Sequence, residues 1–496
     1  MPTTSRRRRR VLDLPIHLDG AIRNQGRQVH AALRAAIVDG LLAPGLTLPS
    51  SRDLAAQLGV RRNAIVAAYE HLASDGLIEA RHGAGTTVAE RLPEPTPPAP
   101  AAAPRLAHAP VRARPFLLGQ TGTDARLLRR LGGLVRRRIA GATADELGYG
   151  DPRGSAHLRA QVAAYLAANR GVRCDPECIA IVSGTQAAIR LCADALLPPG
   201  SRVWMEDPGY YATQATLRAA GLRLAPVPVD DAGLDVAAGA RRAAGAKAVY
   251  VTPSHQFPTG VILAMRRRIE LLDWARDSGA WIFEDDYDSE FRYAGPPLTA
   301  LAGLGSGRVI YIGTFTKTLF ASLRLAYVVL PPDVVGRVVA ARAAHDRFPA
   351  RFLQDAVADL IADGTLAAHV RRMRARYREA RDATAAALRE SAGDALRFTV
   401  PEQGLHLLAL LPEGVSRATA LAIRDAAEVE VRLLSDTQLT PRGPEGFILG
   451  FSGFESAALA AAARRIGRAA REIAGGAAQR SPTARRRVRH PTVPLE

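Results

Sequence analysis

A proline-rich stretch between residues 91 and 115 divides this chain of 496 residues into two unequal parts. Its prolines, spaced among alanines, are Pro93, Pro95, Pro97, Pro98, Pro100, Pro104, Pro110 and Pro115. Proline has no backbone N–H and favours extended backbone, so this composition predicts a semi-rigid linker. The linker leaves residues 12–90 for a small first domain and residues 116–475 for a much larger second one.

The two ends of the chain are basic, and we expect residues 1–11 and 476–496 to be disordered tails. The formal net charge is +18 and the pI about 10.7, which favours a polyanionic partner, although the tails supply part of that charge. No apolar run approaches the ~20 residues of a membrane span, and the N-terminus lacks a signal-peptide core. We therefore expect a cytoplasmic protein. Three cysteines fit neither a metal knuckle nor a disulfide framework and are expected to be free thiols: Cys174, Cys178 and Cys192.

Residues 12–90 carry the pattern of a winged helix-turn-helix. An apolar stripe at helical spacing is formed by Val29, Leu33, Ile37 and Leu41. Ser50 and Asp53 have the form of a capping box, which predicts that a helix begins there. After a turn at Gly59, a second helix is predicted over residues 62–74, and two short strands over residues 77–80 and 86–88.

The second helix of such a motif presents its first residues to the major groove of DNA. Arginine suits guanine edges and phosphates, and asparagine suits adenine. Arg52, at the start of the preceding helix, is placed for a phosphate, and the glycines of the wing allow close approach to the minor groove. The candidate DNA-binding residues are Ser51, Arg52, Arg61, Arg62, Asn63, His82, Gly83 and Gly85.

In the larger domain, strand-like and helical stretches alternate, which predicts an α/β fold with a mostly parallel sheet. Lys317 is one of only two lysines in a chain that otherwise uses arginine, the other being Lys247. A desolvated lysine amine can attack an aldehyde, whereas arginine stays protonated. Thr314 and Thr316 flank it with hydroxyl groups. Taken alone, Lys317 fits a surface loop equally well.

Three further motifs suit a phosphorylated pyridine cofactor. The predicted strand 179–182 runs into Ser183, Gly184, Thr185 and Gln186 at a helix N-terminus, which is a favourable place for a phosphate. Tyr210 follows a turn and is a candidate to stack on a planar ring. The strand from Trp281 ends in carboxylates, of which Asp285 can keep a pyridine nitrogen protonated, while Tyr287 can bond a phenolic oxygen. Arg324 offers a fork for phosphate.

Calcium is a competing ligand for the acidic cluster, because Asp286, Asp288 and Glu290 alternate. An EF-hand loop needs glycine at its sixth position, and Phe291 stands there. We therefore assign no metal site.

The first domain resembles the DNA-binding domain of the GntR family. The residues that carry this likeness are Gly40 to Gly45, Leu48 to Ala55, Leu58 to Val60, Ala68, Tyr69, Leu72, Gly76 and Gly83 to Thr86. The larger domain resembles fold-type I aminotransferases over about 360 residues, through Tyr149 to Gly154, Leu158 and Arg159, Ser183 to Gln186, Glu206 to Tyr210, Thr252 to Gly260, Glu284 to Tyr293 and Gly313 to Leu319. A GntR-type head, a proline-rich linker and such a body resemble the MocR-type transcriptional regulators.

This resemblance implies pyridoxal 5′-phosphate as cofactor. It implies that Lys317 forms the aldimine, that Asp285 lies on the ring nitrogen and Tyr287 on the phenolic oxygen, and that Tyr210 stacks on the ring. Arg324, Gly184 and Thr185 are implied as phosphate ligands, with Ser183, Gln186, Thr314 and Thr316 as further cofactor contacts. Tyr149 matches a tyrosine that reaches the phosphate of a neighbouring subunit, so a homodimer is implied.

The chain departs from the family patterns at three places. Arg61 stands where the GntR family usually has serine, which leaves the half-site preference open. Phe257 stands where aminotransferases have asparagine, and His255 or Gln256 is a candidate substitute. The predicted strand 446–452 lacks the arginine that clamps a substrate carboxylate, and its candidate replacements are Arg432, Arg442 and Arg292.

Three hypotheses follow for the function. The first is a transcriptional regulator that binds a double-stranded DNA operator and senses pyridoxal phosphate or an amino-acid-like effector. The second is an active aminotransferase with a DNA-binding appendage. The third, a body without cofactor, is disfavoured by the intact Lys317 motif. The missing carboxylate-binding arginine favours the first over the second.

Overall fold

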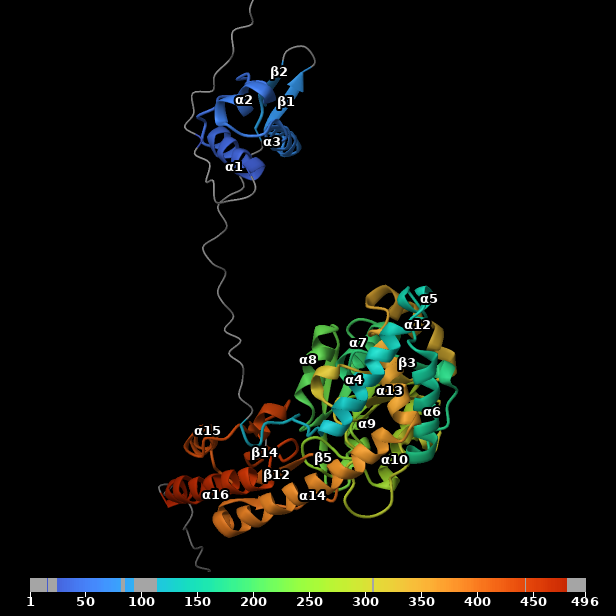
Figure 1. Cartoon of the computed structure of the whole chain (residues 1–496). Helices are drawn as coiled ribbons and strands as arrows, with labels where there is room; N and C mark the ends of the chain where they lie inside the picture. The colour runs from blue at the N-terminus through green and yellow to red at the C-terminus, as the bar shows by residue number, and fades with distance from the viewer. Residues whose placement is uncertain are drawn as a thin grey trace, which may run out of the picture. The chain divides into compact units, whose positions relative to one another are not determined.

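The computed structural model describes Ile16 and residues 25–81, 85–92, 114–305, 307–441 and 443–479. The chain divides into two compact units, one within residues 1–111 and the other within residues 112–496 (Figure 1). Several expected features lie outside the described residues, namely the N-terminal tail, most of the linker, residues 480–496, Arg442, and the wing residues His82 and Gly83.

The first unit is a three-helix head with a β-hairpin. Its elements are α1 (Gln25–Val38), α2 (Ser51–Leu58), α3 (Arg62–Ser74), β1 (Ile78–Arg81) and β2 (Gly85–Val88). Ser50 caps α2 by accepting from the backbone N–H of Asp53, and Gly59 ends it with a φ of 66°. Its core includes Leu33, Leu54 and Ile65, all fully buried. The winged helix-turn-helix expectation is thereby confirmed.

One residue of the expected apolar stripe is placed differently. Leu41 lies beyond the end of α1 and its side chain is 69% exposed. Gly40 adopts a left-handed φ of 75°, which turns the chain away before helical spacing can bring Leu41 to the core. The buried position after the turn is taken by Leu42.

The second unit is built on an eight-stranded sheet of order β3-β10-β9-β8-β7-β4-β5-β6. Its strands are β3 (Ile179–Val182), β4 (Arg202–Asp207), β5 (Arg223–Asp230), β6 (Gly233–Leu234), β7 (Ala248–Val251), β8 (Trp281–Asp286), β9 (Val309–Thr314) and β10 (Ala326–Val329). Strands β9, β8, β7, β4 and β5 are parallel to their neighbours in that order, while β10 runs antiparallel to both β3 and β9. The parallel strands therefore end along one edge of the sheet.

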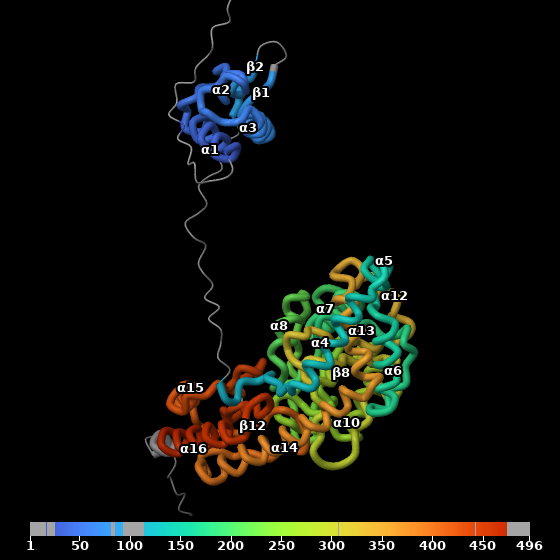
Figure 2. The backbone as a smooth tube through the Cα atoms, in the orientation of Figure 1, coloured from blue at the N-terminus to red at the C-terminus, as the bar shows by residue number. Residues whose placement is uncertain are grey.

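Both faces of this sheet are buried, as the period-two alternation of a strand requires. Along β3, Ile179 and Ile181 pack into one apolar cluster, and Ala180 and Val182 into another. The helices of this part of the unit are α4 (Ala125–Ala140), α5 (Ala144–Leu147), α6 (Ala156–Arg170), α7 (Thr185–Leu196), α8 (Tyr211–Ala219), α9 (Val236–Arg242), α10 (Met265–Ser278), α11 (Leu301–Leu304), α12 (Val335–His345) and α13 (Arg351–Ala362). Figure 2 shows helices packed around the sheet, among them α7, α10 and α13.

A second, smaller sheet of order β11-β12-β14-β13 forms the C-terminal part of this unit. Its elements are β11 (Arg397–Phe398), β12 (His406–Leu410), β13 (Arg432–Leu433) and β14 (Gly446–Gly450), with helices α14 (Thr365–Ala392), α15 (Arg417–Ala426) and α16 (Ser456–Gln479). The long helices α14 and α16 lie side by side (Figures 1 and 2). Helix α16 reaches Gln479, past the point where the tail was expected to begin, because this segment is rich in alanine, the strongest helix former.

None of the helices in the described part of the chain is long and apolar enough to cross a membrane.

Candidate functional site

A cavity of about 360 Å³ opens where β7, β8 and β9 of the large sheet end. Its lining joins segments that are far apart in the sequence. The lining residues are Leu118, Gly119, Gln120, Gly184, Thr185, Gln186, Tyr210, Tyr211, Tyr250, Thr252, Phe257, Asp285, Tyr287, Thr314, Thr316, Lys317, Ala321, Arg324, Leu405 and His406. Ten of the twelve expected cofactor-binding residues are among them.

Lys317 follows β9 in a tight turn and faces this cavity. Burial lowers the pKa of its amine, while the nearby carboxylates Asp288 and Asp285 oppose that shift. A β-carbon on Gly119 would lie 3.2 Å from Lys317 Nζ, so the backbone there approaches the amine closely. The lysine is therefore held in a narrow space in an environment that favours its nucleophilic, uncharged form.

Asp285 lies near the end of β8 with its carboxyl group buried. The phenol of Tyr250 donates to Asp285 Oδ2 at 2.6 Å, while Oδ1 is buried without a hydrogen-bond partner. Burial, with the neighbouring charges of Asp286 and Asp288, raises the pKa of Asp285 to about 7. A protonated ring nitrogen would satisfy the orphaned Oδ1, so this residue fits a pyridine cofactor.

A second group of lining residues is suited to a dianion. Gly184 precedes α7 with a φ of 127°, and a β-carbon there would lie 3.2 Å from Arg324 Nη2. The guanidinium of Arg324 thus lies against the backbone at the N-terminus of α7. Thr185 and Gln186 begin that helix and line the same space. Helix N–H groups beside an arginine fork form a favourable phosphate site.

Two expected cofactor contacts lie outside the cavity lining of this chain. The hydroxyl of Ser183 is 3.4 Å from Asp346 Oδ2 and does not line the cavity. The side chain of Tyr149 is 87% exposed, with the guanidinium of Arg347 4.9 Å from its ring centre.

The sequence motifs missed about half of the cavity lining. The segment Leu118–Gln120 reaches the cavity because the chain pairs with the smaller sheet at Phe116, whose carbonyl accepts from the N–H of Gly450 at 3.0 Å. Leu405 and His406 arrive from that same sheet. Tyr250 carries a signal that could have been used, since it lies near the end of the strand beside Asp285.

The three alternating carboxylates considered for calcium make separate contacts. Asp286 accepts from Arg170 Nε at 2.7 Å, and Asp288 Oδ2 lies 2.8 Å from His255 Nδ1. Glu290 accepts from the phenol of Tyr165 at 2.9 Å. Each of these carboxylates serves a separate contact, which argues against a shared calcium ion.

Phe257 stands where aminotransferases have asparagine, and Gln256 was one candidate to replace it. The side-chain amide of Gln256 already forms hydrogen bonds to other residues. Its amide nitrogen donates to the Pro208 carbonyl at 2.9 Å, and its oxygen accepts from Thr259 Oγ1 at 2.7 Å. His255 lies against Tyr287, whose phenol oxygen is 3.0 Å from His255 Nδ1. Phe257 itself lines the cavity, 5.3 Å from the ring of Tyr210 between ring centres. His255 therefore reaches the cofactor space through Tyr287.

The candidate carboxylate clamps are also separated by the structure. Arg292 is turned to Gln403, to which its Nη1 donates at 2.8 Å, and it does not line the cavity. The guanidinium of Arg432 lies 3.6 Å above the ring of Tyr211, a lining residue. Arg432 is thus the nearer of the two described candidates.

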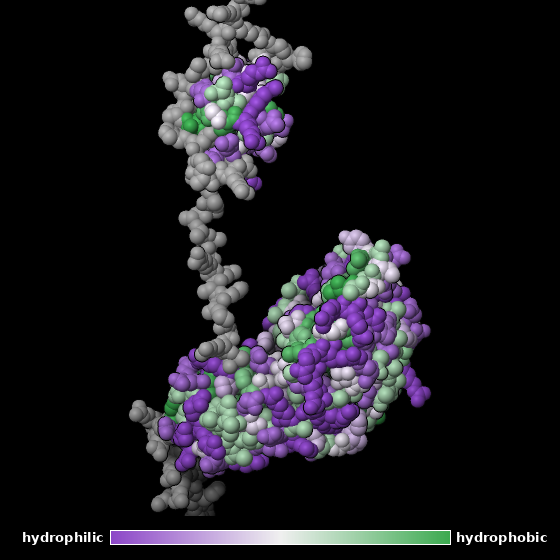
Figure 3. All heavy atoms as spheres, in the orientation of Figure 1, coloured by the Kyte–Doolittle hydropathy of each residue, from purple (hydrophilic) through white to green (hydrophobic). Residues whose placement is uncertain are grey.

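In the head, five of the expected DNA-binding residues lie at the starts of α2 and α3. Arg61, Arg62 and Asn63 are exposed at the start of α3, and Arg52 is exposed in the first turn of α2. Arg62 Nε lies 3.4 Å from Ser51 Oγ, which joins the two helices at this surface. Gly85 begins β2. Figure 3 shows hydrophilic side chains gathered on the side of the head that carries α3 and β1.

Comparison with known families matches each unit separately. Residues 25–88 match the bacterial regulatory proteins of the gntR family, and residues 127–465 match aminotransferase class I and II. A probable rhizopine catabolism regulatory protein, MocR, of Rhizobium meliloti is 35% identical over 463 residues, covering 90% of this chain and 92% of that protein.

A second relative, the pyridoxine biosynthesis transcriptional regulator PdxR of Corynebacterium glutamicum, is 31% identical over 356 residues, covering 71% of this chain and 76% of that protein. Among solved structures, the α-aminoadipate aminotransferase LysN of Thermus thermophilus is similar with a TM-score of 0.66 and 27% identity. That likeness covers 73% of this chain and 92% of LysN, which was solved in complex with N-(5′-phosphopyridoxyl)-L-leucine.

Proposed function

The chain belongs to the transcriptional regulators that join a GntR-type DNA-binding domain to an aminotransferase class I and II domain, and we propose that its large unit is the ligand sensor of that regulator. Its cofactor is pyridoxal 5′-phosphate, as the aminotransferase fold implies. That cofactor supplies an aldehyde that reacts with amines and a ring that withdraws electrons.

The residues of the cavity divide that task between them. Lys317 Nζ provides the amine, and burial keeps it available as a nucleophile. Asp285 Oδ1, which has no partner of its own, holds a proton at the ring nitrogen, and Tyr250 fixes the orientation of that carboxylate. Arg324 and the N-terminus of α7 would hold the phosphate, and Tyr287 would bond the phenolic oxygen.

The observation that carries the sensor proposal is a cavity fitted for the cofactor but without the usual carboxylate clamp. Strand β14 contains no arginine, whereas Lys317, Asp285 and Tyr287 all line the cavity. We assign carboxylate recognition to Arg432, whose guanidinium lies 3.6 Å above the ring of Tyr211, a residue of the cavity lining. The effector class is therefore an amino-acid-like molecule with a carboxylate, or pyridoxal phosphate itself.

The head is the part of the chain that binds the DNA partner. The exposed arginines and asparagine at the start of α3 suit base edges in the major groove of an operator duplex. A ligand that favours one arrangement of the chain changes operator binding by its differential affinity for that arrangement. Binding to chromosomal DNA would locate the protein in the cytoplasm.

We further propose a homodimer in which Tyr149 enters the cavity of the partner subunit. Its 87% exposure in the single chain leaves a large aromatic side chain uncovered next to Leu147, which is 70% exposed. Two heads in one dimer would read two half-sites of an operator.

The test is to select bound duplexes from a random-sequence library with the full-length protein, and then to measure affinity for the enriched sequence. Arg62→Ala should weaken specific binding by about 1–3 kcal/mol, because one base-reading side chain is lost. Arg34→Ala is the matched control, since it removes the same charge from the exposed side of α1. Equal losses in the two variants would contradict the assignment of α3.

Amino acids and pyridoxal phosphate are then added to the complex, with keto acid assayed in parallel. We expect one ligand to change operator affinity without accumulation of keto acid. The second candidate function, an active aminotransferase, is favoured by the full set of Lys317, Asp285 and Tyr287 in the cavity. Keto acid formed over many turnovers would establish it.

A further inference from the structure

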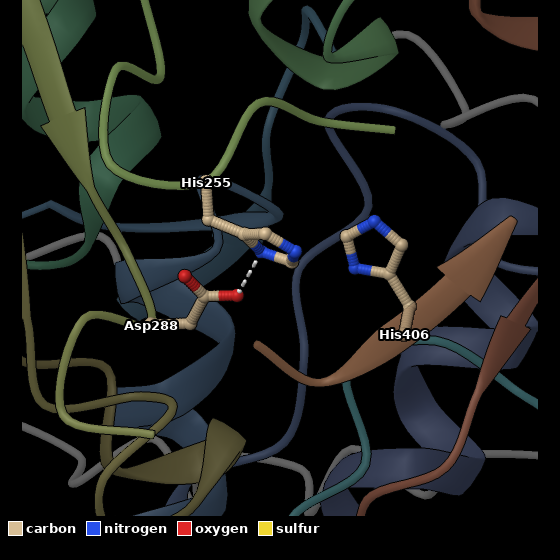
Figure 4. A group of neighbouring side chains, drawn as sticks. All are labelled: His255, Asp288 and His406. Carbon is tan, nitrogen blue, oxygen red and sulfur yellow. Dashed lines mark hydrogen bonds and ion pairs between the residues drawn. The ribbon is translucent and has the colours of Figure 1, made fainter. Parts of the chain in front are cut away.

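Two histidines and an aspartate meet beside the cofactor cavity, brought there by three separate segments (Figure 4). His255 follows β7, Asp288 follows β8, and His406 is the first residue of β12 in the smaller sheet. Their exposed fractions are 1%, 1% and 3%, so all three are buried. One nitrogen or oxygen atom from each lies within 4.8 Å of the others.

The hydrogen bonds of His255 determine which of its nitrogens is free. His255 Nδ1 lies 2.8 Å from Asp288 Oδ2 and 3.0 Å from the phenol oxygen of Tyr287. The Tyr287 phenol donates its proton to the carbonyl oxygen of His255 at 3.1 Å, so a proton on Nδ1 satisfies both neighbouring oxygens. His255 Nε2 is then left with a lone pair. This atom is buried and has no hydrogen-bond partner.

The same argument applies to His406 with its nitrogens exchanged. His406 Nε2 lies 3.1 Å from the carbonyl oxygen of Pro258, which can only accept, so Nε2 carries the proton. His406 Nδ1 therefore also presents a lone pair. Figure 4 shows a ring nitrogen of each histidine turned toward the other ring, and the ring centres are 4.9 Å apart.

The buried, unpartnered His255 Nε2 costs free energy unless a cation or donor lies against it, and His406 Nδ1 is the nearby atom that can share such a cation. We propose that His255 Nε2 and His406 Nδ1 are ligands of a divalent transition-metal ion of the zinc class. Imidazole suits such ions, with metal–nitrogen distances of about 2.0–2.1 Å. Asp288 occupies the position of the carboxylate that orients a metal-bound histidine from behind.

A proton shared directly between the rings is the simpler alternative. His255 Nε2 forms no hydrogen bond with His406 or with any other described residue, so the structure shows no shared proton. A metal ion can bind both nitrogens at once, and the ligand atoms of the three residues all lie within 4.8 Å of one another. His406 also lines the cofactor cavity, so the proposed ion would lie beside that cavity.

The three residues of this site come from both sheets of the large unit. His255 and Asp288 belong to the end of the large sheet, and His406 to the smaller sheet. A bound ion would join the two sheets next to Lys317. The expectation of no metal rested on sequence spacing, and these three residues are too far apart in the chain for any spacing rule to detect.

The proposal is tested by equilibrium dialysis of untagged full-length protein against Zn²⁺ alone, with bound metal counted by mass spectrometry. We expect one tightly bound ion per chain. His255→Gln and His406→Gln should each weaken its binding by at least about tenfold, since each removes a ligand. His345→Gln is the matched control, because this histidine lies at the exposed end of α12 and should bind Zn²⁺ as the wild type does.

Variants count only if they keep the wild-type melting temperature and the visible absorption of the bound cofactor. Co²⁺ on the wild-type protein gives a measurement that needs no variant: its visible d–d bands should be those of a nitrogen-ligated ion and should disappear when Zn²⁺ is added. Absence of bound Zn²⁺, an unaltered affinity in both folded variants, or the spectrum of fully hydrated Co²⁺ would each overturn the site. None of these readouts depends on DNA binding or on an effector.

Discussion

At the scale of single residues, the cavity works by controlling charge through burial. Lys317 and Asp285 are both shifted toward their uncharged forms because water is largely excluded around them. The amine gains nucleophilicity, and the carboxyl group remains ready to bond a ring nitrogen. Tyr250 and Gly119, which carry no charge, set the positions of these two groups.

The scarcity of lysine makes the covalent assignment testable. Lys317→Ala should abolish cofactor that borohydride reduction fixes to the protein, because no amine would remain in the cavity. Lys247→Ala is the matched control, since Lys247 is exposed and is the only other lysine. The measurement is the mass of the reduced protein and its visible absorption. Label retained by Lys317→Ala, or lost from Lys247→Ala, would contradict the assignment.

The raised pKa of Asp285 predicts a pH dependence of stability in the cofactor-free protein. Burial raises this pKa from 3.8 to about 7, so the folded state keeps a proton that the unfolded state has released. The contribution to the free energy of unfolding is fully present below about pH 4 and is lost as the pH rises to about 7. The melting temperature of the wild type should therefore fall more over this range than that of Asp285→Asn, which does not titrate. Parallel curves for the two proteins would refute this.

At the scale of elements, the site depends on how strands end and how closely they approach. In the register of β9 and β10, Gly313 lies directly opposite Tyr327. A β-carbon at position 313 would lie 2.3 Å from Tyr327 Cζ, so the tyrosine ring covers the bare backbone. Lys317 lies four residues after Gly313. The packing of β9 against β10 therefore fixes where the turn that carries Lys317 starts.

Gly313→Ala should therefore lower the free energy of unfolding by about 1–3 kcal/mol, because the buried ring of Tyr327 has nowhere to move. Gly336→Ala is the control. Nothing lies within 4 Å of a β-carbon at that helical position in α12, so it should be neutral or stabilising by up to about 1 kcal/mol. Chemical denaturation, followed by circular dichroism, measures both. Equal effects would show that the approach of Tyr327 to Gly313 has no energetic importance.

At the scale of the whole molecule, the chain separates DNA reading from ligand binding. Each unit has a hydrophobic core of its own. Figure 3 shows hydrophobic atoms at the surface near α5 of the large unit. Exposed apolar side chains in that region include Leu147, with Tyr149 close by in the sequence. A second copy of the chain is the partner that we propose for this surface.

Leu147→Asp should raise the dissociation constant of the dimer by at least about tenfold, because it buries an unpaired charge in the proposed interface. Met265→Asp is the control, since it adds the same charge at another exposed apolar residue, in α10. Light scattering during size-exclusion chromatography at several concentrations measures the effect. A Leu147→Asp protein that dimerises like the control would exclude this region as the interface.

Local sequence signals predicted the elements of the head well. The capping pair at Ser50 and the left-handed Gly59 act within a few residues, so the helix 62–74 was predicted with the bounds that the structure has. The prediction that Leu41 belongs to the buried stripe was wrong, because hydrophobic periodicity does not indicate the turn at Gly40. In the large unit, strand-end motifs predicted Lys317, Asp285 and the start of α7, since each depends on one strand and the turn after it.

The sequence by itself thus determined which units fold, which family chemistry they carry and which residues are candidates to hold the cofactor ring and phosphate. Only the tertiary structure decided what surrounds them. It turned Ser183 away from the cavity, set Tyr250 behind Asp285, brought Gly119 against Lys317, and joined His406 to His255. These contacts link segments up to about two hundred residues apart, and no local pattern encodes which distant strand pairs with which. Packing of the two sheets supplies that information.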